Sequence, residues 1–220
     1  MAMGREGENV RFVVLISGSG GVLQAILDAC RTERLHGQVV AVFSHEPYAY
    51  GLLRAEREGV PAFLHDPAEY RFEGRNEHDF EADLAEHVAK FAPDYVILAE
   101  WRLPLGETFL RRFPDRVINL HAGLPGQFPV FDPYGLNPVQ RAYEAYTAGF
   151  IRETGVTAHI LRAPQHEGPI LAQERVPIYE FDTPGDVAER FYRVQCELLV
   201  NVLRRLVEER EMYRVQGEHG

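Results

Sequence analysis

The sequence predicts one α/β domain: a mostly parallel, twisted sheet with helices on both faces and a Rossmann-like N-terminal half. Apolar, β-branched runs alternate with segments of helical spacing, which favours parallel strands joined by crossover helices. The runs are continuously apolar, as expected for strands that are buried on both sides. A length of 220 residues, 45% of them apolar and 25% charged, suits a single globular domain. We expect this domain at residues 10–212, after a disordered leader at 1–9 and before a tail at 213–220.

The first half of the chain alternates strands and helices in a regular way. The run from Val10 to Ile16 is apolar and β-branched, and the segment from Val22 to Cys30 has apolar residues at helical spacing. The predicted strands are 10–16, 38–44, 61–65 and 95–99, and the predicted helices are 22–30, 51–58 and 77–91. This alternation predicts a doubly wound sheet.

The second half has a different pattern. A strand at 116–120 leads into the segment 122–138, in which prolines prevent regular structure. A long irregular loop in a compact domain is usually functional. Further along we predict a helix within 137–148, hairpin strands at 156–161 and 170–174, and a last helix at about 186–211 that Thr183 caps.

Charge and cysteine content exclude several classes of function. The formal net charge is -10, which argues against a nucleic acid or an anionic membrane as the partner. No apolar run approaches the ~20 residues that span a bilayer, and the short polar N-terminus is no secretory signal. Cys30 and Cys196 stand alone within apolar helical patterns, as buried thiols do in a reducing compartment. We therefore expect a cytoplasmic protein.

The first candidate site is the glycine-rich turn from Ser17 to Gly21, between the first strand and the first helix. Glycines let backbone N–H groups turn toward an anion, and the helix N-terminus adds positive potential. The spacing matches neither a dinucleotide-binding fingerprint nor a P-loop. Position alone leaves two interpretations equally open: a phosphate-binding turn, or a tight turn that needs glycine for its geometry.

The second candidate is the pair Asn119 and His121 at the end of a strand. Residues two apart on a strand point to the same face, and open α/β sheets bind ligands at the carboxyl ends of their strands. An amide donor beside an imidazole suits stabilisation of an oxyanion with proton transfer nearby. A structural role is more common for a lone histidine, but the glycine- and proline-rich loop that follows favours function.

The third candidate is formed by Thr157 and His159, which share one strand face, together with His166 across the next turn. The alternative interpretation is an exposed hairpin tip. The histidines at 121, 159 and 166 raise the question of a metal ion, but their spacing fits no common ligand motif, and we predict none.

These pieces occur in one order along the chain: SGSGG, LAEWR, NLH, GVTAH and EGP. In that order the chain resembles the folate-dependent formyltransferase family, from about Arg11 to Leu206. The Asn-x-His signal at 119–121 is the more specific mark of that family. The resemblance implies a formyltransferase fold and the transfer of a formyl group from 10-formyltetrahydrofolate, a folate co-substrate, to a small amine, phosphorylated or not, in purine biosynthesis. It leaves a homodimer open.

The resemblance also implies roles for individual residues. Asn119 and His121 would stabilise a tetrahedral oxyanion. Folate would contact Leu98, Trp101, Arg102, Leu103, Pro104, Gln165 and Glu167. The amine substrate would contact Gly18, Ser19, Gly20, Gly21, Arg75, Thr157 and His159.

The chain departs from the family pattern on the amine side. His166 stands where the family has a catalytic aspartate, Gly21-Val22 replaces Ser-Asn, and Gln195 replaces a substrate-contacting glutamate. A second imidazole beside His121 would disfavour protonation of both rings.

These departures leave the catalytic base open among His166, Asp132 and Glu167. They also keep two alternative functions in view. One is hydrolysis of formyltetrahydrofolate, and the other is folate binding without transferase activity.

Overall fold

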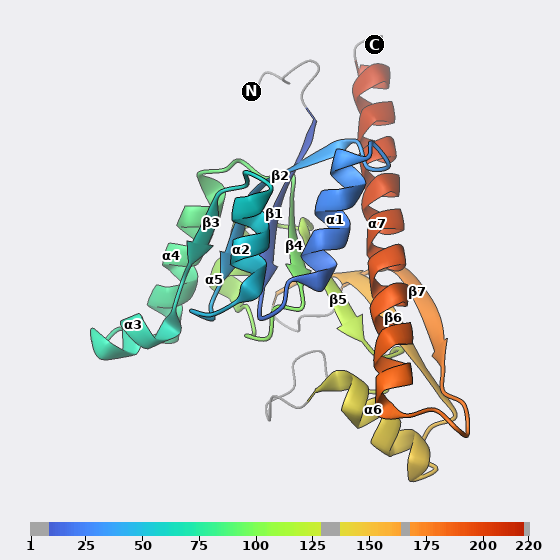
Figure 1. The fold of residues 1–220 in the computed structure, drawn as a ribbon. Helices are drawn as coiled ribbons and strands as arrows, with labels where there is room; N and C mark the ends of the chain where they lie inside the picture. The colour runs from blue at the N-terminus through green and yellow to red at the C-terminus, as the bar shows by residue number, and fades with distance from the viewer. Residues whose placement is uncertain (1–8, 129–136, 164–167, 218–220) are drawn as a thin grey trace.

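The computed structural model describes residues 9–128, 137–163 and 168–217. Within these residues seven strands form one sheet, in the order β3-β2-β1-β4-β5-β6-β7 (Figure 1). The strands are β1 (Val10–Ile16), β2 (Gly37–Ser44), β3 (Ala62–Leu64), β4 (Tyr95–Ala99), β5 (Val117–Ala122), β6 (Glu153–Ile160) and β7 (Ile170–Pro177). The first five run parallel to one another, and β6 and β7 are antiparallel to their neighbours. The predicted mostly parallel sheet is confirmed.

Helices cover both faces of the sheet, as predicted. They are α1 (Gly21–Arg31), α2 (Tyr50–Arg57), α3 (Pro67–Phe72), α4 (Glu77–Ala89), α5 (Glu107–Arg112), α6 (Pro138–Thr147) and α7 (Pro184–Gly217). Helices α1 and α7 pack on one face, and α4 and α5 pack on the other (Figure 1). The sequence patterns did not predict α3 and α5, because six residues are too few to display a helical period.

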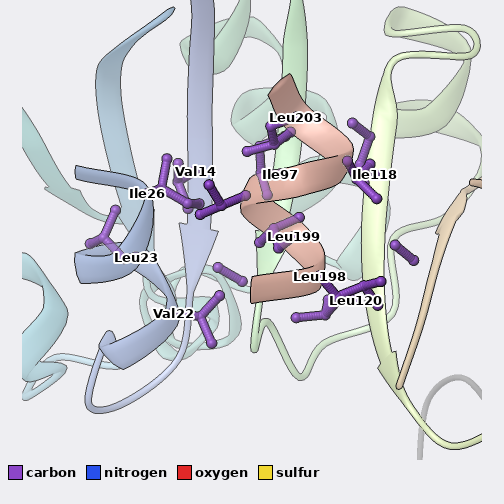
Figure 2. Packing of buried hydrophobic residues seen from close by; sticks show 14 of the residues in the cluster. Val14, Val22, Leu23, Ile26, Ile97, Ile118, Leu120, Leu198, Leu199 and Leu203 are labelled. Atoms are coloured by element: carbon purple, nitrogen blue, oxygen red, sulfur yellow. The ribbon is translucent and has the colours of Figure 1, made fainter. Parts of the chain in front are cut away.

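The core consists of two apolar clusters, one on each side of the sheet. Along β1, Val14 belongs to the cluster under α1 and α7, whereas Val13 and Leu15 belong to the cluster under α4 and α5. Figure 2 shows the first cluster, in which Leu199 and Leu203 of α7 meet the sheet. The alternation explains why the β1 run is apolar at successive positions: each face needs its own apolar side chains.

Some boundaries differ from the prediction. Helix α7 runs from Pro184 to Gly217, so residues 213–217, expected to belong to a tail, are helical. Its predicted cap is confirmed: the Asp186 N–H donates to Thr183 Oγ1 (3.3 Å), and the Thr183 N–H donates to the Asp186 carboxylate (2.8 Å). The leader expected at 1–9 lies outside the described residues except for its last residue. None of the helices in the described part of the chain is long and apolar enough to cross a membrane.

Candidate active site

Four polar side chains form a buried group on one face of β5 and β6. The antiparallel register places His159 opposite Asn119 and Thr157 opposite His121. Their exposed fractions are only 5% for Asn119, 8% for His121, 4% for Thr157 and 6% for His159. The structure therefore brings together four residues that the sequence placed in two separate candidate sites, and we call them the polar quartet.

Two hydrogen bonds hold the polar quartet in place. The Asn119 amide Nδ2 lies 3.0 Å from His159 Nε2. An amide NH2 group can only donate, so Nε2 of His159 is the acceptor and the second amide hydrogen of Asn119 remains for another partner. Thr157 Oγ1 donates to the Gly123 carbonyl (2.8 Å) and so fixes the backbone just after β5.

The His121 imidazole is held in a neutral form. Burial lowers the pKa of His121 to about 4, helped by the repulsion between the two rings when His159 is protonated as well and by the positive charge of Arg141, while a hydrogen bond to the Phe128 backbone opposes that shift. Gly123 leaves room for the ring, because a Cβ at this position would lie 2.9 Å from His121 Nε2. At neutral pH the ring can therefore accept a proton or donate one hydrogen bond.

The glycines of the Ser17–Gly21 turn are needed for packing. Gly20 has a φ of +67°, and a Cβ on it would lie 2.5 Å from the Gly51 Cα of α2. A Cβ on Gly21 would lie 2.7 Å from the Tyr192 ring of α7. Close packing thus explains both residues, and the role of the turn in binding phosphate stays a prediction.

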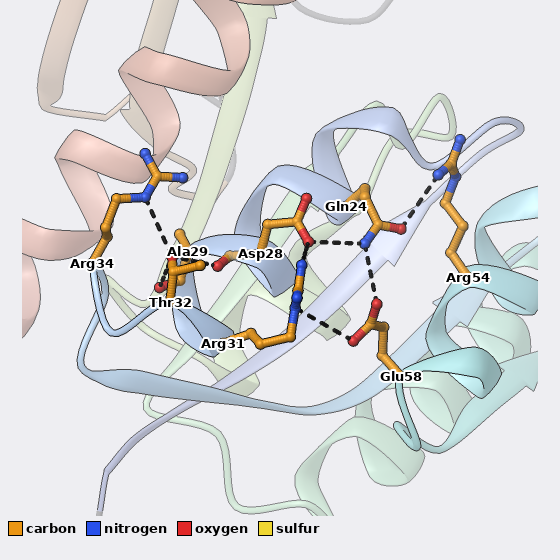
Figure 3. A network of polar contacts seen from close by, with 8 residues as sticks. All are labelled: Gln24, Asp28, Ala29, Arg31, Thr32, Arg34, Arg54 and Glu58. Carbon is orange, nitrogen blue, oxygen red and sulfur yellow. Dashed lines mark hydrogen bonds and ion pairs between the residues drawn. The ribbon is translucent and has the colours of Figure 1, made fainter.

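Arg54 of α2 forms a hydrogen bond with the backbone of the Ser17–Gly21 turn. Arg54 Nε donates to the Ser19 carbonyl (2.9 Å), and Arg54 Nη1 donates to Gln24 Oε1 (3.3 Å). Gln24 continues the network to Asp28 and Glu58 (Figure 3). Sequence patterns contain no sign of Arg54, because its place beside the turn depends on how α2 packs against α1.

A second polar cluster joins the carboxyl ends of β1, β2 and β4. Ser17 Oγ accepts from the Arg102 N–H (3.2 Å) and shares a hydrogen bond with His45 Nε2 (2.6 Å). Burial lowers the pKa of His45. Arg102 also pairs with Glu46 (3.3 Å). Ser17 was predicted as the first residue of the glycine-rich turn, whereas His45 was not among the predicted site residues. His45 directly follows β2, and open α/β sheets bind ligands at such strand ends.

Trp101, in the segment predicted to contact folate, has an indole N–H without a hydrogen-bond partner among the described residues. Its ring is 4% exposed and packs edge-on against His45, with centroids 4.8 Å apart. Within the described residues no acceptor meets its buried Nε1–H. A buried donor without a partner is costly, so this atom fits a ligand that brings an acceptor.

Other predicted residues lie elsewhere. Arg75 pairs with Asp83 (2.6 Å) and covers the Tyr70 ring near α3 and α4. That region adjoins β3, which β2, β1 and β4 separate from β5 in the sheet (Figure 1), so Arg75 is not brought to the polar quartet. Leu98 is fully buried in the core.

The remaining predicted residues divide into two groups. Leu103 and Pro104 follow Arg102 in the segment between β4 and α5. Asp132, Gln165, His166 and Glu167 lie outside the described residues. Among the residues that the structure describes, no group of three or more His, Cys, Asp or Glu side chains is placed to hold a metal ion.

The sheet is doubly wound, and its polar groups lie at the carboxyl ends of the parallel strands. This arrangement is typical of ligand-binding α/β enzymes. Comparison with known proteins identifies the family within this class. The model of the formyl transferase family matches residues 10–203. The chain therefore belongs to the formyl transferase family, as its resemblance predicted.

Individual relatives agree with this assignment. The chain is 37% identical to the phosphoribosylglycinamide formyltransferase of Schizosaccharomyces pombe over 206 residues, covering 89% of this chain and 96% of that protein. It is 34% identical to the Escherichia coli enzyme of the same name, over 82% of this chain and 79% of that protein. The structure of glycinamide ribonucleotide transformylase 1 from Symbiobacterium toebii matches with a TM-score of 0.81 and 37% identity, covering 96% of this chain and 93% of that one. A formyltetrahydrofolate deformylase from Pseudomonas putida, 24% identical with a TM-score of 0.76 over 94% of this chain and 68% of that one, shares the fold.

Proposed function

We propose that this formyltransferase moves the formyl group of 10-formyltetrahydrofolate to the amine of glycinamide ribonucleotide. The names of its relatives support the ribonucleotide acceptor and the transfer of a formyl group. The observation that carries the proposal is the buried polar quartet at the end of β5, with Asn119 and His121 side by side on one face.

The reaction needs hydrogen-bond donors at one oxygen atom. The amine nitrogen attacks the formyl carbon, a C–N bond forms, and the formyl oxygen becomes an oxyanion. The oxyanion then collapses, the bond from carbon to the folate nitrogen breaks, and the proton lost by the amine ends on that nitrogen. Asn119 offers its second amide hydrogen to the oxyanion, and His159 holds the amide in the orientation that this requires.

His121 suits the proton transfer. Its neutral ring can take a proton from the attacking amine and return it to the departing folate nitrogen. An oxyanion beside the ring raises the pKa of His121 during the reaction, because the negative charge favours the imidazolium. The pKa of His121 is therefore low before the reaction and rises as the negative charge of the oxyanion develops.

Two features support the placement of the substrates. The unused Trp101 Nε1–H lies on the α4 and α5 side and fits the acceptor atoms of a folate ring. The N-terminus of α1 attracts an anion, and the described residues place no carboxylate in ion-pair contact with the neighbouring Arg54, which favours the phosphate of the ribonucleotide there.

The proposal is tested by incubating the purified protein with 10-formyltetrahydrofolate, with and without glycinamide ribonucleotide, and measuring the tetrahydrofolate that is released. We expect release that depends on the ribonucleotide. Equal release without the ribonucleotide would identify a hydrolase. The absence of release in both mixtures would show that the protein does not transfer the formyl group as proposed.

A further inference from the structure

Glu100, the residue directly after β4, has an unusual backbone conformation. Its φ is +65°, in the left-handed region that glycine adopts without strain. Among the described non-glycine residues, Glu33, Ala92 and Asp115 also have positive φ values, but they lie in turns that lead from a helix into a strand, at the opposite edge of the sheet. Strained residues concentrate at functional sites, and Glu100 is at the edge where ligands bind.

The neighbouring strands place Glu100 between the two parts of the site. Ala99 pairs with Ile16, just before the Ser17–Gly21 turn, and Leu98 pairs with Asn119. Glu100, the next residue after Ala99, therefore lies between the Ser17–Gly21 turn and the strand that carries Asn119 and His121.

The carboxylate of Glu100 lies close enough to α7 for its charge to act on two side chains of that helix. Burial raises the pKa of Cys196 to about 11, and the negative charge of Glu100 adds to that shift. Burial and Cys196 likewise raise the pKa of Tyr192, again with a contribution from Glu100, while Arg54 opposes it. Glu100 is thus close to the ring that covers Gly21, on the opposite side of the sheet from Trp101.

The carboxylate of Glu100 lacks a partner within the described residues. None of them forms a hydrogen bond or ion pair with it. Arg102, whose positive charge lowers the pKa of Glu100, pairs with Glu46 instead (3.3 Å). Glu100 is half-buried, and burial raises its pKa. A carboxylate that is withdrawn from water normally has donors around it. A glutamate with a purely structural role would accept hydrogen bonds from the protein, and a glutamate on the surface would be hydrated. Glu100 fits neither description within the described residues.

We propose that Glu100 recognises the acceptor substrate by accepting hydrogen bonds from N–H or O–H groups next to the attacking nitrogen. This inference rests on the proposed function and names the group that selects its second substrate. The acceptor lies on the α7 side, with its anionic end toward Arg54 and its donor groups at Glu100. The ribose hydroxyls and the amine of glycinamide ribonucleotide are donors of this kind.

The test compares Glu100→Gln and Glu100→Gly with the wild type in steady-state kinetics. Loss of a hydrogen bond to a charged group weakens binding by roughly 10- to 100-fold, so we expect the KM for glycinamide ribonucleotide to rise at least about tenfold in both variants. The KM for 10-formyltetrahydrofolate should stay within about twofold of the wild type, because Glu100 does not face the folate side.

Glu33 provides the matched control. It is an exposed glutamate with a φ of +58° in the turn after α1. Glu33→Gly and Glu100→Gly both relieve a left-handed backbone, so both should raise the Tm by about 2–4 °C. Glu33→Gly and Glu33→Gln should leave both KM values unchanged.

Three outcomes would overturn the inference: an unchanged ribonucleotide KM in both Glu100 variants, an equal rise in the folate KM, or an equal rise in the Glu33 variants. If the wild type transfers no formyl group, the proposed function fails. Titration calorimetry then tests the role of Glu100 separately, by comparing the affinity of the wild type and of Glu100→Gln for glycinamide ribonucleotide. Binding that is at least tenfold weaker in Glu100→Gln supports the inference. Equal binding, or no binding to the wild type, overturns it.

Discussion

In the proposed mechanism, Asn119 and His121 have different tasks although they share one face of β5. Asn119 is oriented by its bond to His159 and would offer a fixed donor, whereas the neutral His121 ring would move a proton. Because Asn119 and His159 are buried and hydrogen-bonded to each other, removal of one takes a partner from the other in a place that solvent does not reach. Substitutions of these two residues are therefore expected to be coupled.

His121→Ala tests the catalytic role of the imidazole. We expect kcat to fall by about 10²- to 10⁴-fold, as is typical when a general acid–base group is lost. Circular dichroism should show an unchanged fold, because the apolar clusters do not depend on this side chain. His36→Ala, at an exposed position in the turn before β2, is the control and should keep full activity. A folded His121→Ala variant with wild-type kcat would remove His121 from the mechanism.

The low pKa of His121 also predicts how stability changes with pH. The unfolded chain takes up a proton near pH 6.5, but the folded chain takes it up only near a pKa of about 4. The free energy of unfolding is therefore undiminished above pH 6.5 and falls as the pH drops toward 4, by on the order of 3 kcal/mol from this residue. Urea unfolding at pH 7.5 and pH 4.5 measures the change.

His121→Asn supplies the comparison for that measurement. It removes the titrating ring, so its free energy of unfolding should fall less between the two pH values than that of the wild type. Burial also lowers the pKa values of His45 and His65, so part of the pH dependence should remain. The same pH dependence in wild type and variant would show that His121 is not the group responsible.

Among the elements, α1 and α2 meet at a contact between two glycines. A Cβ on Gly51 would lie 2.3 Å from Ile16 Cδ1 and 3.0 Å from the Gly20 Cα. The second of these atoms belongs to the backbone of the turn and cannot move aside as a side chain does. The position of the turn at the end of β1 is therefore set by helix packing as well as by its own sequence.

Gly51→Ala should destabilise the protein by about 1–3 kcal/mol, because it overpacks this contact. The displaced turn should also bind glycinamide ribonucleotide more weakly, as calorimetry can show. Gly185→Ala, where the added Cβ makes only an ordinary 3.6 Å contact with Thr183, is the control. Its effect on stability should stay within about 0.5 kcal/mol. Equal stability of the two variants would contradict a packing role for Gly51.

At the scale of the whole molecule, α7 holds the two halves of the sheet together. It packs against α1 in the first half and against α6, β6 and β7 in the second (Figures 1 and 2). It also carries Tyr192, which covers Gly21. Helix α7 thus connects the Ser17–Gly21 turn to the antiparallel strands that complete the polar quartet.

Leu203→Ala should lower the free energy of unfolding by about 2–5 kcal/mol, because it leaves a cavity in the cluster between α7 and the sheet. The side chain is fully buried there. Met212→Ala, on the same helix but 58% exposed, should change stability by less than about 0.5 kcal/mol. Urea unfolding of both variants checks the difference, and a small effect of Leu203→Ala would mean that α7 contributes little to the core.

The amino-acid sequence by itself determined the fold class, most strand and helix positions, the cap of α7 and the family, because these depend on local periodicity, capping and short motifs. It also predicted that Asn119 and His121 share a face, since the period of a strand is two residues. Only the tertiary structure decided which partners surround them: the register of β5 and β6 brings His159 to Asn119, the packing of α2 brings Arg54 to the turn, and the pairing of β4 places Glu100 between them. The physical reason is that these contacts join residues far apart in the chain, and no local pattern encodes their distance.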